Sequence, residues 1–195
     1  FIGKSNVVLI LGDNFFYGQG LTKKLKDSVK LKRGAEVFLH PITDPSSYGV
    51  AKVNKKNKII KIVEKPKKYL SNLAITGLYF FDNRVVSYSK NLKPSKRKET
   101  EIVDLLNKYR KNNKLNAEFL GRGGAWLDTG SIEDFYKTSA FVSALENRQG
   151  FKIACLEEIA YNYNWINKYK IKKAIKFYGN CSYSNYLKTF LKKTL

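Results

Sequence analysis

Short apolar segments alternate with amphipathic segments along most of this chain, and this alternation constrains the fold more than any other feature. Apolar runs typical of strands cover residues 6–11, 35–40, 48–53, 59–63, 74–81 and 115–120. Segments with helical periodicity cover residues 21–31, 84–92 and 99–112, and a capping sequence at 131–134 opens another that reaches about residue 148. Strands alternating with helices predict an α/β fold with a mostly parallel mixed sheet.

The sequence changes character near residue 150. From Phe151 onward it is mixed and rich in aromatic residues, which suggests short packed helices. A chain of 195 residues is long enough for one domain with its own core. We therefore expect a catalytic domain over residues 1–150 and a small, mainly helical C-terminal appendage over residues 151–195, which is not an independent domain.

The net charge of +21 permits two interpretations. A basic protein can bind nucleic acid or an acidic membrane surface. Here, however, the excess is lysine spread over the whole chain, and not one stripe with interleaved aromatic residues. We favour a generally lysine-rich composition and expect no nucleic-acid or membrane partner, while a non-enzymatic nucleic-acid-binding protein stays an alternative.

Other classes of protein fit the sequence poorly. No apolar run approaches the ~20 residues that a membrane-spanning helix needs. Cys155, Cys181 and the isolated His40 do not form a zinc-binding pattern, and no Ser/His/Asp or Cys/His nucleophile arrangement can be built. Two separated thiols without a recognisable secretion signal indicate a cytoplasmic protein.

Two aspartates follow apolar runs in glycine-containing turns. Asp13 lies in "LGDN" and Asp128 in "AWLDTG". Open α/β sheets bind ligands beyond the carboxyl ends of their strands, and two carboxylates there could hold Mg²⁺, which prefers oxygen ligands. Aspartate is also a common turn former, so the spacing alone leaves both interpretations open.

The sequence "VEKP" places a carboxylate and an ammonium group at a strand end. Lys65 could bind a phosphate as a point charge, and Glu64 could accept hydrogen bonds from sugar hydroxyls. In a chain with so many lysines, an ordinary surface pair before a proline turn is the favoured interpretation of these residues on their own. In "SYGV", Gly49 could let the backbone face a ligand, although a plain hairpin entry is the alternative.

Seven ordered blocks together resemble one family. They are "LGDNFFYG", "DPSSYGV", "EKP", "ITGLYFFDN", "NLKPSKRKETEIVD", "GRGGAWLDTG" and "ENRQGFKIACLEEIA". Their order from residue 7 to about residue 160 is similar to that of the glucose-1-phosphate thymidylyltransferases, which are sugar nucleotidyltransferases with a Rossmann-like fold. The resemblance implies Mg²⁺-dependent transfer of a nucleotidyl group from dTTP to glucose 1-phosphate, giving dTDP-glucose and pyrophosphate.

The resemblance also implies roles for individual residues. Asp13 and Asp128 match the two Mg²⁺-binding aspartates, and Lys65 matches the lysine at the sugar phosphate. Substrate contacts are implied for Asn14, Tyr48, Gly49, Glu64 and Ile75. A regulatory nucleotide site at a subunit interface is implied for Tyr17, Gly18, Arg122, Glu146 and Arg148.

The family's glycine-rich nucleotide loop and its base-reading segment would precede "LGDN", and neither is in this sequence. We therefore expect a fold truncated at its N-terminus, an activity that belongs to a longer parent, and an isolated chain that is inactive. A sugar-phosphate-binding remnant and a relative that uses UTP stay open. The family implies a homotetramer for the full-length parent and a product used for rhamnose or another cell-surface deoxysugar.

Overall fold

The structure is a computed structural model that describes residues 1–95 and 97–193. The chain separates into two compact units, Phe1–Asp134 and Phe135–Leu195. The boundary expected at residue 150 stays a prediction, and residues 194–195 of the expected appendage lie outside the described part.

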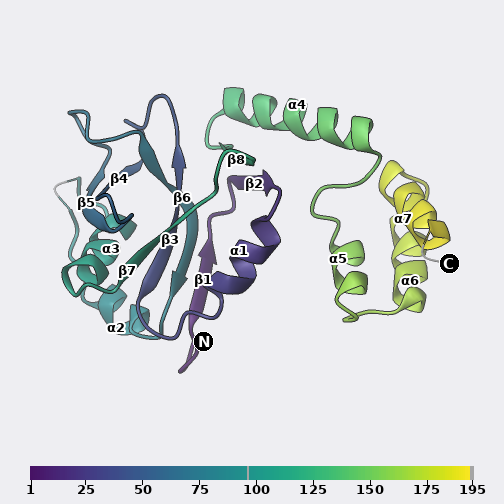
Figure 1. The fold of residues 1–195 in the computed structure, drawn as a ribbon. Helices are drawn as coiled ribbons and strands as arrows, with labels where there is room; N and C mark the ends of the chain where they lie inside the picture. Colours follow the sequence, from purple (N-terminus) through teal and green to yellow (C-terminus); the bar gives the residue numbers. More distant parts are fainter. Residues whose placement is uncertain (96, 194–195) are drawn as a thin grey trace. The chain divides into compact units, whose positions relative to one another are not determined.

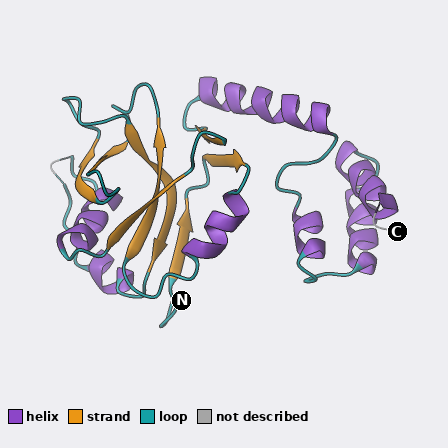
Figure 2. Ribbon diagram, viewed as in Figure 1, coloured by secondary structure: helices purple, strands orange, loops and turns teal. Residues whose placement is uncertain are grey.

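The first unit is built on one curled mixed sheet (Figures 1 and 2). Its strands follow the spatial order β5-β4-β6-β3-β7, and β1 also pairs with β6. The bounds of these strands are Val7–Ile10 for β1, Ala35–Pro41 for β3, Gly49–Val53 for β4, Ile59–Glu64 for β5, Leu73–Phe81 for β6 and Leu115–Phe119 for β7.

The α/β class and the mixed sheet agree with the sequence-based expectation, but the share of parallel pairs is smaller than predicted. Among the described strands of this sheet, β3 and β7 pair in parallel, while the pairs of β6 with β1, β3 and β4 and the β4–β5 pair are antiparallel. A turn closed by the Asn54 N–H on the Lys58 carbonyl oxygen, at 2.9 Å, joins β4 to β5. A tight turn makes its two strands antiparallel, and the apolar pattern of a strand does not encode its direction.

Two strands share one edge of β6. Strand β1 pairs with its C-terminal half, with Ile10 opposite Leu78, and β4 pairs near its start, with Val50 opposite Ala74. The two strands approach from opposite ends and leave a gap in the ladder around residues 75–77. This gap positions the candidate site.

Strand β1 is more exposed than its apolar sequence predicted. A continuous apolar run is typical of a buried strand, yet Val8 is 52% exposed and Ile10 is 57% exposed. Of the described strands, β1 pairs only with β6, so its outer edge carries no neighbouring strand. The apolar run is therefore an edge strand.

A second, two-stranded ribbon pairs β2 (Asn14–Gly18) with β8 (Gly124–Asp128). The aromatic residues of "FFYG" at 15–18 thus belong to a strand. The glycine-rich segment around β8 does bring backbones together: a Cβ on Gly18, whose φ is 155°, would lie 2.7 Å from the Gly123 carbonyl oxygen. Only glycine fits such an approach at this φ.

The faces of the main sheet carry two cores. Helix α3 (Ile102–Lys111) contributes Val103, Leu106 and Tyr109 to one apolar cluster with the sheet. Helix α1 (Leu21–Ser28) packs against the other cluster, which contains Trp126. The short helix α2 (Val85–Lys90) follows β6.

The second unit is helical. Helix α4 (Ile132–Gln149) begins in the first unit, and α5 (Leu156–Asn162), α6 (Lys168–Tyr178) and α7 (Ser182–Lys193) follow it. Cys155, Ile171 and Leu187 form the buried cluster of this unit. A mainly helical C-terminal part agrees with the sequence-based expectation. Among the described residues, no helix is both long and apolar enough to cross a bilayer.

Candidate functional site

The β2–β8 ribbon brings Asp13 and Asp128 together from distant parts of the sequence. Asn14 pairs directly with Asp128 in the ladder. Beside this pair, the Thr129 N–H and hydroxyl both donate to the Asp13 carbonyl oxygen, at 2.8 and 2.9 Å. The two aspartates predicted from turn sequences are therefore neighbours across one end of the ribbon.

Both carboxylates are held by local hydrogen bonds. The Asn14 amide nitrogen donates to Oδ1 of Asp13 at 2.7 Å, and the Gly130 N–H donates to Oδ1 of Asp128 at 2.9 Å. The described residues contain no group of three or more histidine, cysteine, aspartate or glutamate side chains that could hold a metal. A pair of carboxylates fits a hard cation such as Mg²⁺, which commonly keeps waters and binds substrate phosphates in its other positions.

The aspartates border a pocket of about 170 Å³ at the gap beside β6. Seven of the eight residues predicted for catalysis, metal binding or substrate binding line this pocket: Asp13, Asn14, Tyr48, Gly49, Glu64, Ile75 and Asp128. Side chains and backbone from β2, β4, β5, β6 and β8 therefore converge on one small cavity.

The absence of a side chain at Gly49 makes space for the Glu64 carboxylate. A Cβ on Gly49 would lie 3.1 Å from Oε2 of Glu64 and 3.0 Å from Val103. Burial and then the negative charge of Glu101 raise the pKa of Glu64, while Lys65 and Arg97 oppose the rise. A partly desolvated carboxylate with raised pKa is a good acceptor for neutral hydroxyl groups, because it retains unsatisfied hydrogen-bonding capacity.

Tyr48 and Trp126 both line the pocket and pack against each other. The Tyr48 ring meets that of Trp126 edge-on, with centroids 5.1 Å apart. Burial, followed by the charge of Asp128, raises the pKa of the Tyr48 hydroxyl. The Tyr48 hydroxyl, which like any tyrosine hydroxyl is protonated at neutral pH, is therefore a hydrogen-bond donor beside Asp128.

Lys65 is the one residue of these eight that does not line the pocket. Its side chain is exposed. Its backbone is unusual, with a φ of 42° directly before Pro66, and its N–H donates to the Tyr48 carbonyl oxygen at 3.0 Å. A residue before proline normally adopts an extended conformation, so this position is strained, as residues near functional sites often are.

Sequence reasoning missed several residues that line the pocket, among them Gly77, Tyr79 and Trp126. The two-residue periodicity of strands could have found them, because alternate residues share a face. Gly77 and Tyr79 follow Ile75 at this spacing in β6, and Trp126 precedes Asp128 at the same spacing in β8. Burial raises the pKa of Tyr79, with the charges of Glu64 and Asp13 adding to the effect.

The five residues predicted for a regulatory nucleotide site fall in two units. Tyr17 and Gly18 lie on β2, and Arg122 lies in the turn before β8. Glu146 and Arg148 lie on α4 in the second unit, where Glu146 accepts hydrogen bonds from Lys152 Nζ at 2.5 Å and from the Ile153 N–H at 3.0 Å. The regulatory site stays a prediction.

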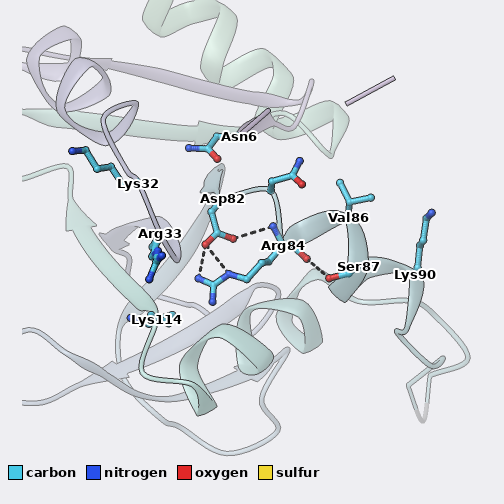
Figure 3. Close-up of a pocket in the computed structure, with 10 residues that line it drawn as sticks. Asn6, Lys32, Arg33, Asp82, Arg84, Val86, Ser87, Lys90 and Lys114 are labelled. Atoms are coloured by element: carbon cyan, nitrogen blue, oxygen red, sulfur yellow. Dashed lines mark hydrogen bonds and ion pairs between the residues drawn. The ribbon is translucent and has the colours of Figure 1, made fainter. Parts of the chain in front are cut away.

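A larger pocket of about 650 Å³ lies at the other end of β6 and is rich in basic residues (Figure 3). Its carboxylate, Asp82, accepts hydrogen bonds from Arg84 Nε at 2.9 Å and from the Tyr109 hydroxyl at 3.0 Å. Burial would raise the pKa of Asp82, but the bonds from Arg84, Gly34 and Tyr109 outweigh burial and lower it. Asp82 thus stabilises the fold, and Lys32, Arg33, Lys90 and Lys114 around it are exposed.

Comparison with known proteins identifies the family of this chain. The family model described as "Nucleotidyl transferase" matches residues 1–144. A glucose-1-phosphate thymidylyltransferase of Neisseria meningitidis serogroup A is 44% identical over 193 residues, which are 99% of this chain and 67% of that protein. One from Xanthomonas campestris pv. campestris is 40% identical over 99% of this chain and 65% of its own length.

Solved structures show the same fold. A glucose-1-phosphate thymidylyltransferase from Bacillus anthracis in complex with sucrose has a TM-score of 0.62 and 38% identity, and the match covers 72% of this chain and 56% of that one. A UDP-glucose pyrophosphorylase in complex with UDP-glucose, at 24% identity and a TM-score of 0.61, shares the fold. This chain thus spans about two thirds of the length of the curated relatives it matches.

Proposed function

Since this chain belongs to the nucleotidyl transferase family, we propose that it forms the sugar-phosphate and cation-binding part of a glucose-1-phosphate thymidylyltransferase. The observation that carries the proposal is the convergence of two carboxylates, Asp13 and Asp128, on a pocket that Glu64 and Gly49 also line. The names of the similar proteins support the substrates dTTP and glucose 1-phosphate.

The proposed reaction needs positioning more than covalent chemistry. A phosphate oxygen of glucose 1-phosphate attacks the α-phosphorus of dTTP, the bond between the α-phosphorus and its bridging oxygen breaks, and pyrophosphate leaves. No enzyme nucleophile takes part. The chain's residues bind the sugar, hold its phosphate and reduce the repulsion between two anions.

Each pocket residue has a role in this scheme. Glu64 accepts hydrogen bonds from sugar hydroxyls, and Gly49 leaves room for the ring. Backbone groups around Ile75 and the Tyr48 hydroxyl are further contacts. Lys65, exposed at the end of β5, reaches the phosphate as a mobile point charge.

Members of this family generally use a divalent metal, and we propose that Asp13 and Asp128 hold Mg²⁺. When bound, the cation neutralises phosphate charge and polarises the phosphoryl oxygens. The oxygen-only donor set of this site supports Mg²⁺ over zinc or copper, which favour nitrogen and sulfur ligands.

Calorimetric titration of dTDP-glucose into this chain, with and without Mg²⁺, tests the proposal. We expect the unaltered chain to bind dTDP-glucose more tightly with Mg²⁺ than without it. Glu64→Gln should weaken binding at least tenfold, because charge-assisted hydrogen bonds to the sugar hydroxyls are lost. In Asp128→Asn, Mg²⁺ should no longer change the affinity. Asp27→Asn is the matched control, because Asp27 is an exposed carboxylate on α1 that pairs with Lys30. Absence of binding under both conditions would contradict the proposal.

The rival functions give different results. A nucleic-acid-binding protein would bind DNA with a steep salt dependence and ignore dTDP-glucose. A UTP-using relative would bind UDP-glucose more tightly than dTDP-glucose. Binding of sugar nucleotide without turnover in this chain, together with turnover in the full-length parent, fits the proposal. The homotetramer and the cytoplasmic location are further proposals for that parent, testable by sedimentation and by cell fractionation.

A further inference from the structure

The side chain of Asn14 is engaged at both ends inside the protein. Its Oδ1 accepts hydrogen bonds from the Gly77 N–H at 2.9 Å and from the Trp126 indole N–H at 2.6 Å. Its Nδ2 donates to Oδ1 of Asp13 at 2.7 Å. Asparagine joins an acceptor and a donor in one planar group, so one side chain can connect these partners.

The Gly77 backbone explains why an amide is needed at this place. The Gly77 carbonyl oxygen accepts from the Leu11 N–H at 2.9 Å, just beyond the end of β1. In an antiparallel strand the N–H and carbonyl of one residue face the same neighbour, so the Gly77 N–H also faces the gap beside β6. The Asn14 amide supplies the acceptor there, because a buried N–H without a partner is costly.

The absence of a side chain at residue 77 makes this contact possible. A Cβ there would lie 2.6 Å from Cγ and Oδ1 of Asn14 and 2.8 Å from its Nδ2. Real Cβ atoms do not approach so closely. Gly77 and Asn14 therefore depend on each other.

Trp126 connects this network to the second carboxylate. Its indole holds Asn14, while its ring packs against Tyr48, whose hydroxyl lies in the field of Asp128. Asp128 itself follows two residues later on the same face of β8. The connections therefore run from Asp13 through Asn14 and Trp126 to the surroundings of Asp128.

We propose that Asn14 is a positioning residue, which fixes the Asp13 carboxylate for cation binding through its bonds to Gly77 and Trp126. This inference rests on the proposed function, because it concerns the cation site of the same pocket. It assigns Asn14 a role other than the direct substrate contact that the family resemblance implies. Groups that hydrogen-bond a metal-binding carboxylate typically contribute ten- to a hundredfold to metal affinity.

Mn²⁺ binding to this chain, followed by electron paramagnetic resonance, tests the proposal without requiring turnover. Mn²⁺ suits carboxylate ligands as Mg²⁺ does and gives a direct signal. We expect Asn14→Ala to weaken Mn²⁺ binding about tenfold. Asn72→Ala is the matched control, since Asn72 is an exposed asparagine in the same unit, and it should leave the affinity unchanged.

A double-mutant cycle separates positioning from general damage to the fold. Trp126→Phe retains an aromatic ring but removes the N–H that donates to Asn14. We expect it to weaken Mn²⁺ binding about threefold, which is less than the effect of Asn14→Ala. If Trp126 acts through Asn14, the double variant binds Mn²⁺ as Asn14→Ala does. If the loss of Mn²⁺ affinity in the double variant equals the product of the two single losses, the residues act independently and the proposed linkage is overturned.

The remaining outcomes are distinct. Mn²⁺ binding that is lost in Asp13→Asn but unchanged in Asn14→Ala overturns the positioning role and leaves the proposed cation site intact. No Mn²⁺ binding to the unaltered chain overturns the cation site and the inference with it. If Asn14→Ala does not fold, solvent exchange of the Trp126 indole proton in the unaltered chain is measured by NMR instead. We expect slow exchange, and rapid exchange would contradict the bond to Asn14.

Discussion

At the scale of single residues, several glycines of the first unit lie very close to neighbouring atoms. Gly77, Gly49 and Gly18 are each positions where an added Cβ would lie within about 3 Å of other atoms. At Gly77 and Gly49 the atoms include polar side chains of the candidate site, Asn14 and Glu64. Substitutions at these glycines therefore test the site geometry without removing a functional group.

We predict that Gly77→Ala destabilises the first unit by about 1–3 kcal/mol, the usual cost of overpacking. The added methyl group would push Asn14 off its bonds to Gly77 and Trp126. Urea unfolding monitored by fluorescence measures the loss. Gly12→Ala is the control, because a Cβ on Gly12 has no atom within 4 Å. Equal stability of the two variants would contradict the packing seen at Gly77.

His40 gives a second residue-scale prediction, because burial lowers its pKa from 6.5. Its Nδ1 is buried and has no hydrogen-bond partner among the described residues. Below pH 6.5 the unfolded chain binds a proton on His40 that the folded chain does not yet bind. The free energy of unfolding therefore decreases as the pH is lowered from 6.5 towards the pKa of His40 in the folded protein.

Denaturation midpoints in urea at pH 7.5 and 5.5 measure this effect. We expect the unaltered protein to lose more stability over this range than His40→Gln, which cannot titrate. His40 is the only histidine in the chain, so no second imidazole contributes to the difference. Parallel pH profiles for the two proteins would show that His40 titrates normally.

At the scale of elements, the edge strand β1 is the exposed weak point of the sheet. It pairs on one side, among the described strands, and carries Val8 and Ile10 at 52% and 57% exposure. An apolar edge strand can pair with another chain and lead to aggregation.

Val8→Lys should therefore reduce self-association of this chain, because a charged edge strand resists pairing. Light scattering over a concentration series measures the change. Val29→Lys is the matched control, since Val29 is 62% exposed but follows helix α1. A similar reduction in both variants would attribute the effect to net charge rather than to the strand edge.

At the scale of the whole molecule, the chain consists of two compact units with separate apolar clusters. Both large clusters and all the residues of the 170 Å³ pocket belong to Phe1–Asp134. A unit with its own core can fold alone.

A chain of residues 1–134 should fold cooperatively and bind Mn²⁺ within about threefold of the longer chain, on the expectation that compact units behave independently. Circular dichroism and paramagnetic resonance measure folding and binding. A chain of residues 1–120 is the control, because it lacks β8 and with it Trp126 and Asp128. Loss of folding in both chains would show that the second unit is required.

The sequence by itself determined most elements and the set of candidate residues. Apolar periodicity placed β3, β4, β5, β6, β7 and the amphipathic helices, because burial of one face leaves a local pattern. The ordered motifs, through family resemblance, selected seven residues that the structure brings to one pocket.

Tertiary structure alone decided which residues act together. Strand direction, the exposure of β1 and the pairing of β2 with β8 depend on partners distant in sequence, and no local pattern encodes them. The contact between Gly77 and Asn14, and the bond from Trp126, exist only because β6, β2 and β8 meet. Hydrogen bonds and close packing act over a few ångströms in space, whatever the separation along the chain, so the arrangement of Asp13 required the fold.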